Sequence, residues 1–237
     1  MRNNYDVIVI GAGAAGMMAA ITAANRKYSV LVIEQKKQEG SKILVTGKGR
    51  CNITNDSDVP DILNNVMTNP TFLYSALYAF PPSRIIEYFN SIGVKTVTER
   101  GRRVFPESSN AIDVRNALVY QMQKAKVDVL KLNKVTEVVK GNDEIYYVTV
   151  KDANGVTDSF GCVNLVFATG GMTYQSTGSD GSGYVLAKNL GHSVTELKGA
   201  LTGLLTKERW VNETMGLTLK NVSLTVLKDD KAIYKEQ

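Results

Sequence analysis

The chain has 237 residues, of which 43% are hydrophobic and 22% charged, with a formal net charge of +5 and a pI near 9.0. This composition is ordinary for a folded domain and argues against disorder. No apolar run is long enough to cross a bilayer, and the first four residues are too polar to begin a secretory signal, so we expect a cytoplasmic protein.

Two cysteines and one histidine are too few for a disulfide framework or a metal cluster, so we expect no metal site. The basic residues form short clusters that are separated by acids and lack interleaved aromatic residues. This pattern favours solvated faces over a nucleic-acid surface, and we expect neither a nucleic-acid nor a membrane partner.

The first element in chain order is a buried strand that turns sharply into a helix. We expect an apolar strand at Val7 to Ile10 and a helix from Ala14 to about Arg26. The motif Gly11-Ala12-Gly13-Ala14-Ala15-Gly16 joins them. A strand, a glycine motif and a helix in this order are typical of a dinucleotide-binding turn, although the glycine spacing alone is weak evidence.

Each glycine of this motif has a separate task. Gly11 permits the tight turn, Gly13 leaves room for a pyrophosphate to touch the backbone, and Gly16 lets the helix lie close against the strand. The first amides of the helix then face the anion, and the helix dipole adds roughly 0.3–1 kcal/mol. The turn therefore predicts a phosphate site that needs no cation.

A second apolar strand, Val30 to Ile33, closes on Glu34. This acid lies about 20 residues beyond the glycines, where dinucleotide-binding folds place a carboxylate against the ribose hydroxyls of adenosine. A carboxylate at that position also disfavours a 2'-phosphate. The alternative interpretation is an ordinary solvated strand end.

The middle of the chain is expected to be mostly helical. It opens with a long polar stretch, residues 35–55, of a kind that is often functional. Apolar residues then recur at helical spacing from about Asp61 to Gly93 and from Ala111 to about Lys126. We expect Gly101 to Pro106 to form an exposed turn and an edge strand, because proline is excluded from the middle of a sheet.

Beyond Lys126 the pattern changes to short β runs. Four of them are interpreted as a meander: Val127 to Leu132, Val135 to Val139, Tyr146 to Lys151 and Val156 to Phe160. A further strand, Val163 to Phe167, returns to the main sheet and ends on Ala168-Thr169-Gly170-Gly171. We therefore expect an α/β fold with a doubly wound, Rossmann-like sheet and an appended antiparallel layer.

A second glycine cluster, Thr177 to Gly183, precedes a helical pattern from Tyr184 to Gly191. Backbone amides in such a cluster form either an anion-binding nest or a flexible loop that caps the helix. The residues leave both interpretations open.

Three segments together resemble one bacterial family. They are the motif Gly11 to Gly16, the run Lys42-Ile43-Leu44-Val45-Thr46-Gly47-Lys48-Gly49-Arg50-Cys51-Asn52, and Ala168 to Gly171. The chain resembles the aminoacetone-oxidase-like FAD-dependent flavoproteins, to which bile-acid dehydroxylation reductases are related. The resemblance spans nearly the whole chain, and its Thr-Gly-x-Gly-Arg-Cys-Asn run is far more specific than the dinucleotide motif. It implies FAD rather than NAD as the cofactor.

The resemblance implies a glutathione-reductase-type fold in which FAD lies extended across the sheet. Adenosine and pyrophosphate would contact the glycine motif and Glu34, the flavin would lie beside Lys42 and the run Thr46 to Asn52, and the backbone of Val135 would reach the adenine. The implied cofactor-binding residues are Gly11, Gly13, Ala14, Ala15, Gly16, Glu34, Gln35, Lys42, Thr46, Gly47, Gly49, Arg50, Cys51, Asn52, Val135, Ala168, Thr169, Gly170 and Gly171.

Three of these residues have a simpler alternative. Lys42 would then be a surface cation, Arg50 the partner of an acid, and Cys51 a packed, inert thiol. The resemblance also covers only the front part of a family member. We expect residues 1–195 to form the FAD-binding domain without its C-terminal return segment, and residues 196–237 to begin a β-rich inserted domain.

We expect an FAD-dependent oxidoreductase, or its N-terminal portion, that transfers a hydride between a small organic substrate or NAD(P)H and the flavin. NAD(P)H would bind transiently, because no second nucleotide-binding domain is visible. No catalytic acid or base can be assigned. One alternative is a truncated dinucleotide-binding module without turnover, and another is a flavin-dependent RNA-modifying protein, suggested by the basic pI.

Overall fold

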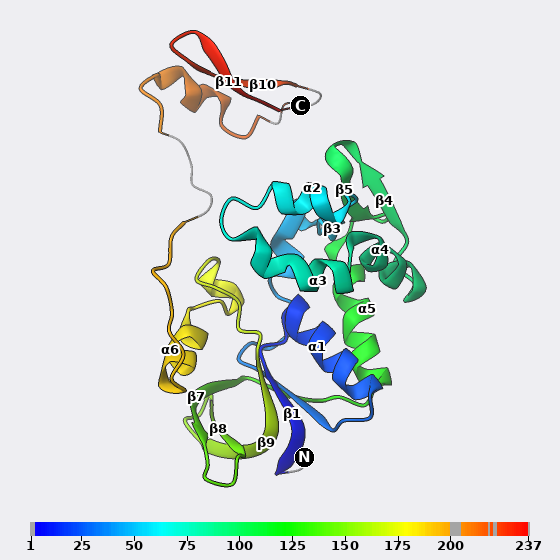
Figure 1. Cartoon of the computed structure of the whole chain (residues 1–237), viewed down its shortest axis with the longest axis vertical. Helices are drawn as coiled ribbons and strands as arrows, with labels where there is room; N and C mark the ends of the chain where they lie inside the picture. Colours follow the sequence, from blue (N-terminus) through cyan, green and yellow to red (C-terminus); the bar gives the residue numbers. More distant parts are fainter. Residues whose placement is uncertain (1–2, 200–204, 218, 220–221, 237) are drawn as a thin grey trace. The chain divides into compact units, whose positions relative to one another are not determined.

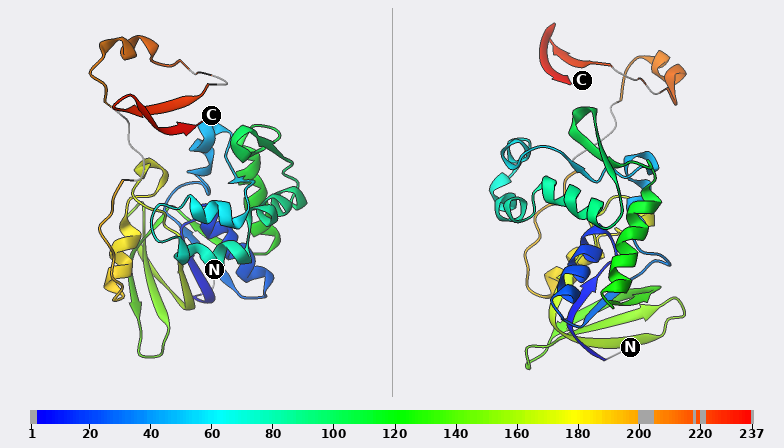
Figure 2. Two further views of the ribbon diagram at one scale, coloured as in Figure 1. Left: turned by 45° about the horizontal axis from the view of Figure 1, so that its top comes forward. Right: turned by 90° about the vertical axis from the view of Figure 1, so that its right-hand side faces the viewer.

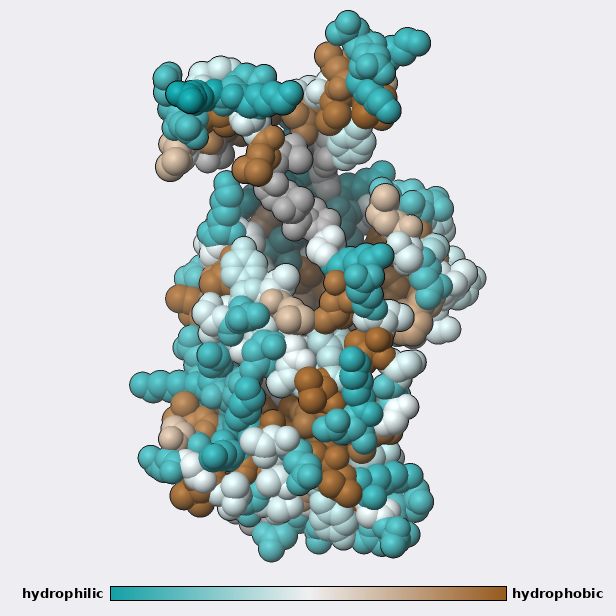
Figure 3. All heavy atoms as spheres, turned by 90° about the vertical axis from the view of Figure 1, so that its left-hand side faces the viewer, coloured by the Kyte–Doolittle hydropathy of each residue, from teal (hydrophilic) through white to brown (hydrophobic). Residues whose placement is uncertain are grey.

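A computed structural model describes residues 3–199, 205–217, 219 and 222–236 of the chain. The chain divides into two compact units, Met1–Val194 and Thr195–Gln237, and each is described by itself (Figure 1). None of the helices in these described ranges is long and apolar enough to span a membrane. On the face of the first unit shown in Figure 3, hydrophobic side chains occur in small groups between hydrophilic ones.

The first unit is built on a six-stranded mixed sheet in the order β6-β2-β1-β9-β8-β7. Its first four neighbours, β6, β2, β1 and β9, run parallel, whereas β9, β8 and β7 pair antiparallel. The strand bounds are β1 (Asn4–Ile10), β2 (Val30–Glu34), β6 (Asp128–Lys131), β7 (Asn133–Lys140), β8 (Tyr146–Asp152) and β9 (Thr157–Phe167). The expected α/β class with a parallel, Rossmann-like sheet is confirmed.

Two details of the expected sheet are wrong. The runs Val156 to Phe160 and Val163 to Phe167 form one continuous strand, β9, whose first half pairs with β8 and whose second half pairs with β1. The run Val127 to Leu132 gives β6, which pairs with β2 in the parallel part and is no meander strand. The antiparallel strands therefore continue the main sheet through hydrogen bonds, because one long strand serves both parts.

Alternate residues of β1 pack into opposite cores, which explains why this strand is apolar throughout. Val7 and Val9 face a cluster with α1 (Ala14–Asn25) and α5 (Ala111–Lys124). Ile8 and Ile10 face a second cluster with residues of β7, β8 and α6 (Ser182–Asn189). Figures 1 and 2 show α1 and α5 together on one side of the sheet and α6 on the other.

A small helical and β subdomain fills residues 43–106. Its three-stranded sheet has the order β3-β5-β4, with β3 (Thr54–Asn55), β4 (Thr96–Glu99) and β5 (Arg103–Pro106). Its helices are η1 (Ile43–Gly49), α2 (Val59–Asn64), η2 (Pro70–Leu73), α3 (Tyr74–Ala79), α4 (Pro82–Ser91) and η3 (Arg100–Arg102), where η marks a 3-10 helix.

The exposed turn expected at Gly101 is confirmed, since residues 101–103 are exposed, but the expected edge strand that follows it is wrong. β5 is the central strand of the small sheet, and Val104 and Phe105 are buried. Pro106 is the last residue of the strand, so its missing N–H falls where the ladder ends. A proline therefore excludes a central strand only when it stands within it.

The remaining elements are short. The 3-10 helix η4 (Gln175–Thr177) lies in the loop between β9 and α6. The second unit contains η5 (Arg209–Thr214) and a hairpin of β10 (Leu224–Lys228) and β11 (Lys231–Glu236).

Candidate functional site

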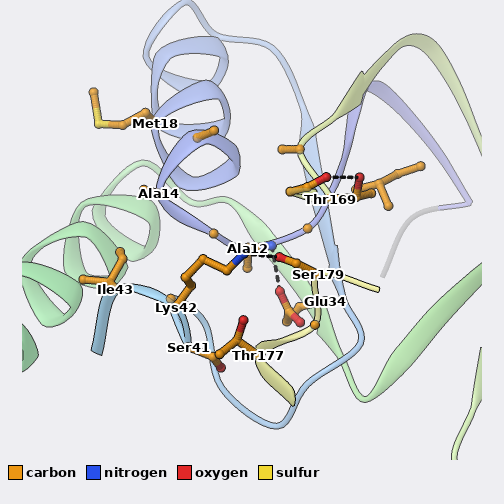
Figure 4. Close-up of a pocket in the computed structure, with 18 of the residues that line it drawn as sticks. Ala12, Ala14, Met18, Glu34, Ser41, Lys42, Ile43, Thr169, Thr177 and Ser179 are labelled. Carbon is orange, nitrogen blue, oxygen red and sulfur yellow. Dashed lines mark hydrogen bonds between the residues drawn. The ribbon is translucent and has the colours of Figure 1, made fainter. Parts of the chain in front are cut away.

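A cavity of about 1000 Å³ opens at the turn between β1 and α1. Its lining comes from the carboxyl ends of the parallel strands β1, β2 and β9, from η1, from the start of β7 and from the loop before α6. The carboxyl edge of a parallel sheet is where folds of this class bind ligands. Figure 4 shows the residues around this turn.

Gly11 and Gly16 are required by the fold itself. Gly11 has φ = 102°, and a Cβ there would lie 2.5 Å from the carbonyl oxygen of Ala168. A Cβ on Gly16 would lie 1.9 Å from the carbonyl oxygen of Gly11. Gly16 thus allows helix α1 to start directly against the turn, as predicted, and it does not line the cavity.

Gly13 is different, because nothing among the described residues requires a glycine there. Its φ of −76° suits any residue, and an added Cβ would meet no atom within 4 Å. Gly13 is the N-cap of α1 and offers no side chain to the helix amides, and the first turn of α1 contains no acid. Both the open space and the amides at the helix start are therefore available to a ligand.

Glu34 lies at the end of β2 and is buried, with 8% of its surface exposed. Its Oε2 accepts a hydrogen bond of 2.8 Å from the backbone N–H of Ala12, and its Oε1 accepts one of 2.8 Å from that of Lys36. The interpretation as a solvated strand end is wrong. Each carboxylate oxygen can accept more than one hydrogen bond, so Glu34 can hold the turn and still face a ligand in the cavity that it lines.

The glycine-rich loop before α6, residues 177–183, forms another part of the cavity wall. Lys42 Nζ donates to Ser179 Oγ at 2.6 Å and to the carbonyl oxygen of Thr173 at 2.9 Å, and Gln35 Nε2 donates to that of Gly178 at 2.5 Å. Figure 4 shows Lys42 and Ser179 pointing toward each other beside Ala12. The ammonium group of Lys42 thus donates to two neutral oxygens at the edge of the cavity.

Loop residues 177–179 line the cavity although the sequence did not assign them to the site. The only signal was the glycine cluster ahead of a helix, which the sequence also allowed as a flexible cap. The hydrogen bonds from Lys42 and Gln35 show that this loop is held in place, because they join it to the stretch after β2 across more than 130 residues of sequence.

The run Thr46 to Asn52 is divided between the cavity and the small sheet. Thr46, Cys51 and Asn52 line the cavity, but Arg50 turns away from it and forms an ion pair with Glu99 at 2.8 Å. The structure therefore supports the alternative in which Arg50 is the partner of an acid. Burial raises the pKa of the Cys51 thiol, and a hydrogen bond with Thr46 offsets only part of that effect, so this thiol is a poor nucleophile.

One arm of the cavity is apolar. It runs between α1, α4 and α5, and Figure 4 shows Met18 and Ile43 on the side away from Glu34. Ile85 and Phe89 of α4 also line this arm and pack against the core of α1 and α5. The hydrophobic and aromatic residues that line this arm are Met18, Ile43, Ile53, Phe80, Ile85, Tyr88, Phe89, Val114 and Leu118.

Most of the sequence-predicted residues meet at this one cavity. Those that line it are Gly11, Gly13, Ala14, Ala15, Glu34, Gln35, Lys42, Thr46, Cys51, Asn52, Val135, Ala168, Thr169 and Gly170. Those outside the lining are Gly16, Gly47, Gly49, Arg50 and Gly171. Gly16 packs α1 against the turn, and Arg50 pairs with Glu99, as described above.

Comparisons with known proteins agree with this geometry. The family model described as HI0933-like protein Rossmann domain matches residues 5–234. The chain is 34% identical over 202 residues to the 3-dehydro-bile acid delta(4,6)-reductase of Clostridium scindens, a match that covers 84% of this chain and 47% of that protein. It is 31% identical over 232 residues to the ribosomal RNA dihydrouridine synthase of Escherichia coli, a match that covers 98% of this chain and 56% of that protein. The chain thus spans about half the length of these curated relatives.

A solved structure gives the same fold. The open conformation of a flavocytochrome c3 fumarate reductase matches with a TM-score of 0.63 and 17% identity, over 79% of this chain and 40% of that chain. At this identity the likeness shows the fold alone.

Proposed function

Because this chain belongs to the HI0933-like family of FAD-dependent Rossmann proteins, we propose that it holds FAD in the cavity at the β1–α1 turn and is part of an oxidoreductase. Gly13 carries this proposal. Its backbone conformation and its open surroundings give the fold no reason to require glycine, whereas a pyrophosphate resting on the helix amides would require it.

The residues present fit the parts of FAD. The amides at the start of α1 suit the pyrophosphate, and Glu34 suits the adenosine ribose. The ammonium of Lys42, which the resemblance assigned to the flavin side, bonds to Ser179 in the loop before α6 and also suits the pyrophosphate. Val135 lines the cavity, and its neighbour Lys134 pairs with Asp180 in the loop before α6, so the backbone of Val135 suits the adenine. Thr46 and Asn52, next to the apolar arm, suit the flavin. When bound, FAD supplies the flavin N5 that exchanges a hydride with a substrate, and the chain supplies binding, orientation and exclusion of water.

The relatives suggest the class of reaction. One is named a reductase of an unsaturated bile acid and the other a synthase of dihydrouridine, and both names denote the addition of hydrogen to an unsaturated ring. We propose the same class here, with NAD(P)H as the hydride donor and a small unsaturated molecule as the acceptor; FAD held by Gly13, Glu34 and Lys42 would supply the chemistry that connects them. The apolar arm beside Phe89 offers such a substrate an apolar wall.

Cofactor binding is tested first, by titrating the purified chain with FAD and recording absorbance and flavin fluorescence. Gly13→Val should abolish retention of FAD, because the new side chain occupies the space of the pyrophosphate. Gly199→Val is the matched control, since a Cβ at Gly199 also meets no atom of the described residues within 4 Å and this residue lies outside the cavity lining. Equal FAD affinity in both variants and the wild type would refute the site.

A binding module without turnover is distinguished by anaerobic addition of NAD(P)H to the FAD-loaded chain. Loss of the oxidised flavin absorbance indicates hydride transfer and excludes the binding-only alternative. A chain that keeps its yellow colour under excess NADH and NADPH supports that alternative. A chain that never retains FAD contradicts the proposed function for this length of sequence.

The match to the ribosomal RNA enzyme favours RNA as a second candidate substrate, because it extends over 98% of this chain. The net charge of +5 agrees in sign with an RNA partner. Binding of a ribosomal RNA fragment should then weaken steeply as salt rises, since cations on the protein release counterions from the RNA. The absence of binding at low salt would remove this candidate and leave the small-substrate proposal intact.

A further inference from the structure

The segment Thr46–Asn52 has an unusual backbone. Four of its residues have positive φ: Gly47 (56°), Lys48 (57°), Gly49 (83°) and Cys51 (61°). Residues other than glycine rarely adopt this region, and they keep it only where the surrounding structure holds them there. Because Thr46, Cys51 and Asn52 line the cavity, whatever holds this segment also sets the shape of the site.

The side chain of Arg50 is fixed from two directions by the small sheet. Its Nη1 and Nη2 donate to Oε1 and Oε2 of Glu99 at 2.8 and 3.3 Å. Its guanidinium carbon also lies 4.0 Å from the centre of the Phe105 ring, and Phe105 is buried. A planar, forked cation suits this combination of a carboxylate and an aromatic face, and lysine would match neither as well.

Glu99 and Phe105 belong to the small three-stranded sheet, which fixes their positions. Glu99 ends β4, and Phe105 lies in β5, the central strand of the small sheet, so both belong to strands that pair with each other. The glycine at position 47 approaches the same ring, since a Cβ there would lie 3.1 Å from an edge carbon of Phe105. The loop therefore touches the sheet at Gly47 and Arg50, between the residues that face the cavity.

We propose that Arg50 is a positioning residue: with Glu99 and Phe105 it holds the back of the segment Thr46–Asn52, so that Thr46, Cys51 and Asn52 keep their places in the cavity wall. This rests on the proposed binding of FAD, whose flavin half would meet that wall. Arg50 does not touch the cofactor, because it lies outside the cavity lining. Its effect should therefore be confined to the flavin half of the site.

The test compares the affinities of FAD and ADP in the same variant. ADP would use the end of the cavity at Gly13, Glu34 and Lys42, which lies at the carboxyl edge of the main sheet, whereas the side chain of Arg50 is held by the small sheet. In Arg50→Ala the affinity for FAD should fall about tenfold, as expected for loss of a bidentate, stacked ion pair, while the affinity for ADP stays within about twofold. Arg50→Lys should recover little of the loss.

The matched control is Arg103→Ala. Arg103 lies over the same ring at 5.9 Å, but it is exposed and outside the loop, so both affinities should remain at the wild-type value. If Arg50→Ala does not fold, Glu99→Gln weakens the contact from the sheet side and should give the same difference between FAD and ADP.

Two outcomes would overturn the positioning role. One is unchanged FAD affinity in both Arg50→Ala and Glu99→Gln. The other is an equal fall in the affinities for FAD and ADP in these variants, which would indicate general destabilisation. Failure of the proposed function looks different, because the wild-type chain would then bind neither nucleotide.

Discussion

Replacing Glu34 with alanine should destabilise the protein even when no ligand is present. The two oxygens of this carboxylate accept hydrogen bonds of 2.8 Å from the N–H groups of Ala12 and Lys36, and they thereby join the end of β2 to the glycine turn. A residue that served only a ribose would leave the ligand-free protein unchanged. The free energy of unfolding of the ligand-free chain therefore separates the two roles.

The magnitude follows from the burial of the two donors. A hydrogen bond to a charged group contributes about 1.5–3 kcal/mol, and a buried donor left without a partner costs about 1–3 kcal/mol. The bond to Ala12 is buried and that to Lys36 only partly so, which lets water replace the second. We expect Glu34→Ala to lower the free energy of unfolding by about 2–4 kcal/mol. Glu34→Gln should recover only part, because one end of its amide would face an N–H donor.

Urea unfolding of the nucleotide-free protein measures this change, read from the midpoint at constant slope. Glu137→Ala is the control, because Glu137 is exposed on β7 and its loss should change the stability by no more than about 0.5 kcal/mol. If Glu34→Ala also changed the free energy of unfolding by no more than about 0.5 kcal/mol, the structural role would be refuted, and a contact with the ligand would be the only remaining role of Glu34.

Three further predictions follow from other contacts. Gly16→Ala should destabilise the chain severely, because its Cβ would lie 1.9 Å from the carbonyl oxygen of Gly11; a thermal melt by circular dichroism measures this, and an unchanged Tm would contradict it. Burial raises the pKa of the Cys162 thiol from 9.0 to about 11. The unfolded thiol then ionises first as the pH rises from 9 to 11, so the free energy of unfolding falls by up to about 3 kcal/mol. Urea titrations across that window should show a smaller fall in Cys162→Ala, and an identical fall would contradict the assignment. Lys42→Met should weaken ADP binding about tenfold in calorimetry, with a smaller effect at high salt, because its ammonium lies beside Ser179 without a carboxylate partner among its described hydrogen bonds. Equal affinity in Lys42→Met at low salt would mean that the ammonium does not meet the ligand.

Local pattern accounts for the part of the site that lies close together in the sequence. The strand, the glycine turn and the helix from Val7 to Asn25 follow one another directly, and the second strand ends on Glu34 as predicted. Apolar runs, helix formers and glycine spacing report on contacts within a few turns of chain, so they were sufficient here. The family assignment also rests on such local runs, and the comparisons confirm it.

Side-chain direction required the tertiary structure. The run that contains Arg50 allowed an acid as its partner but did not identify Glu99, 49 residues away, nor show that Cys51 beside it faces the cavity. Nor did the glycine cluster reveal that Ser179 meets Lys42 across 137 residues. Contacts over such distances in the chain depend on which strands pair and how a loop is held.

The sequence by itself thus determined the kind of ligand, because the backbone that would grip a dinucleotide is encoded within one short strand–turn–helix unit. Only the tertiary structure decided which residues form the rest of the cavity wall. It made β5 a central strand, and it made β9 one strand shared by two parts of the sheet. The physical reason is that packing and hydrogen bonding between distant segments determine which strands pair. The pattern of residues within one strand does not identify its partner.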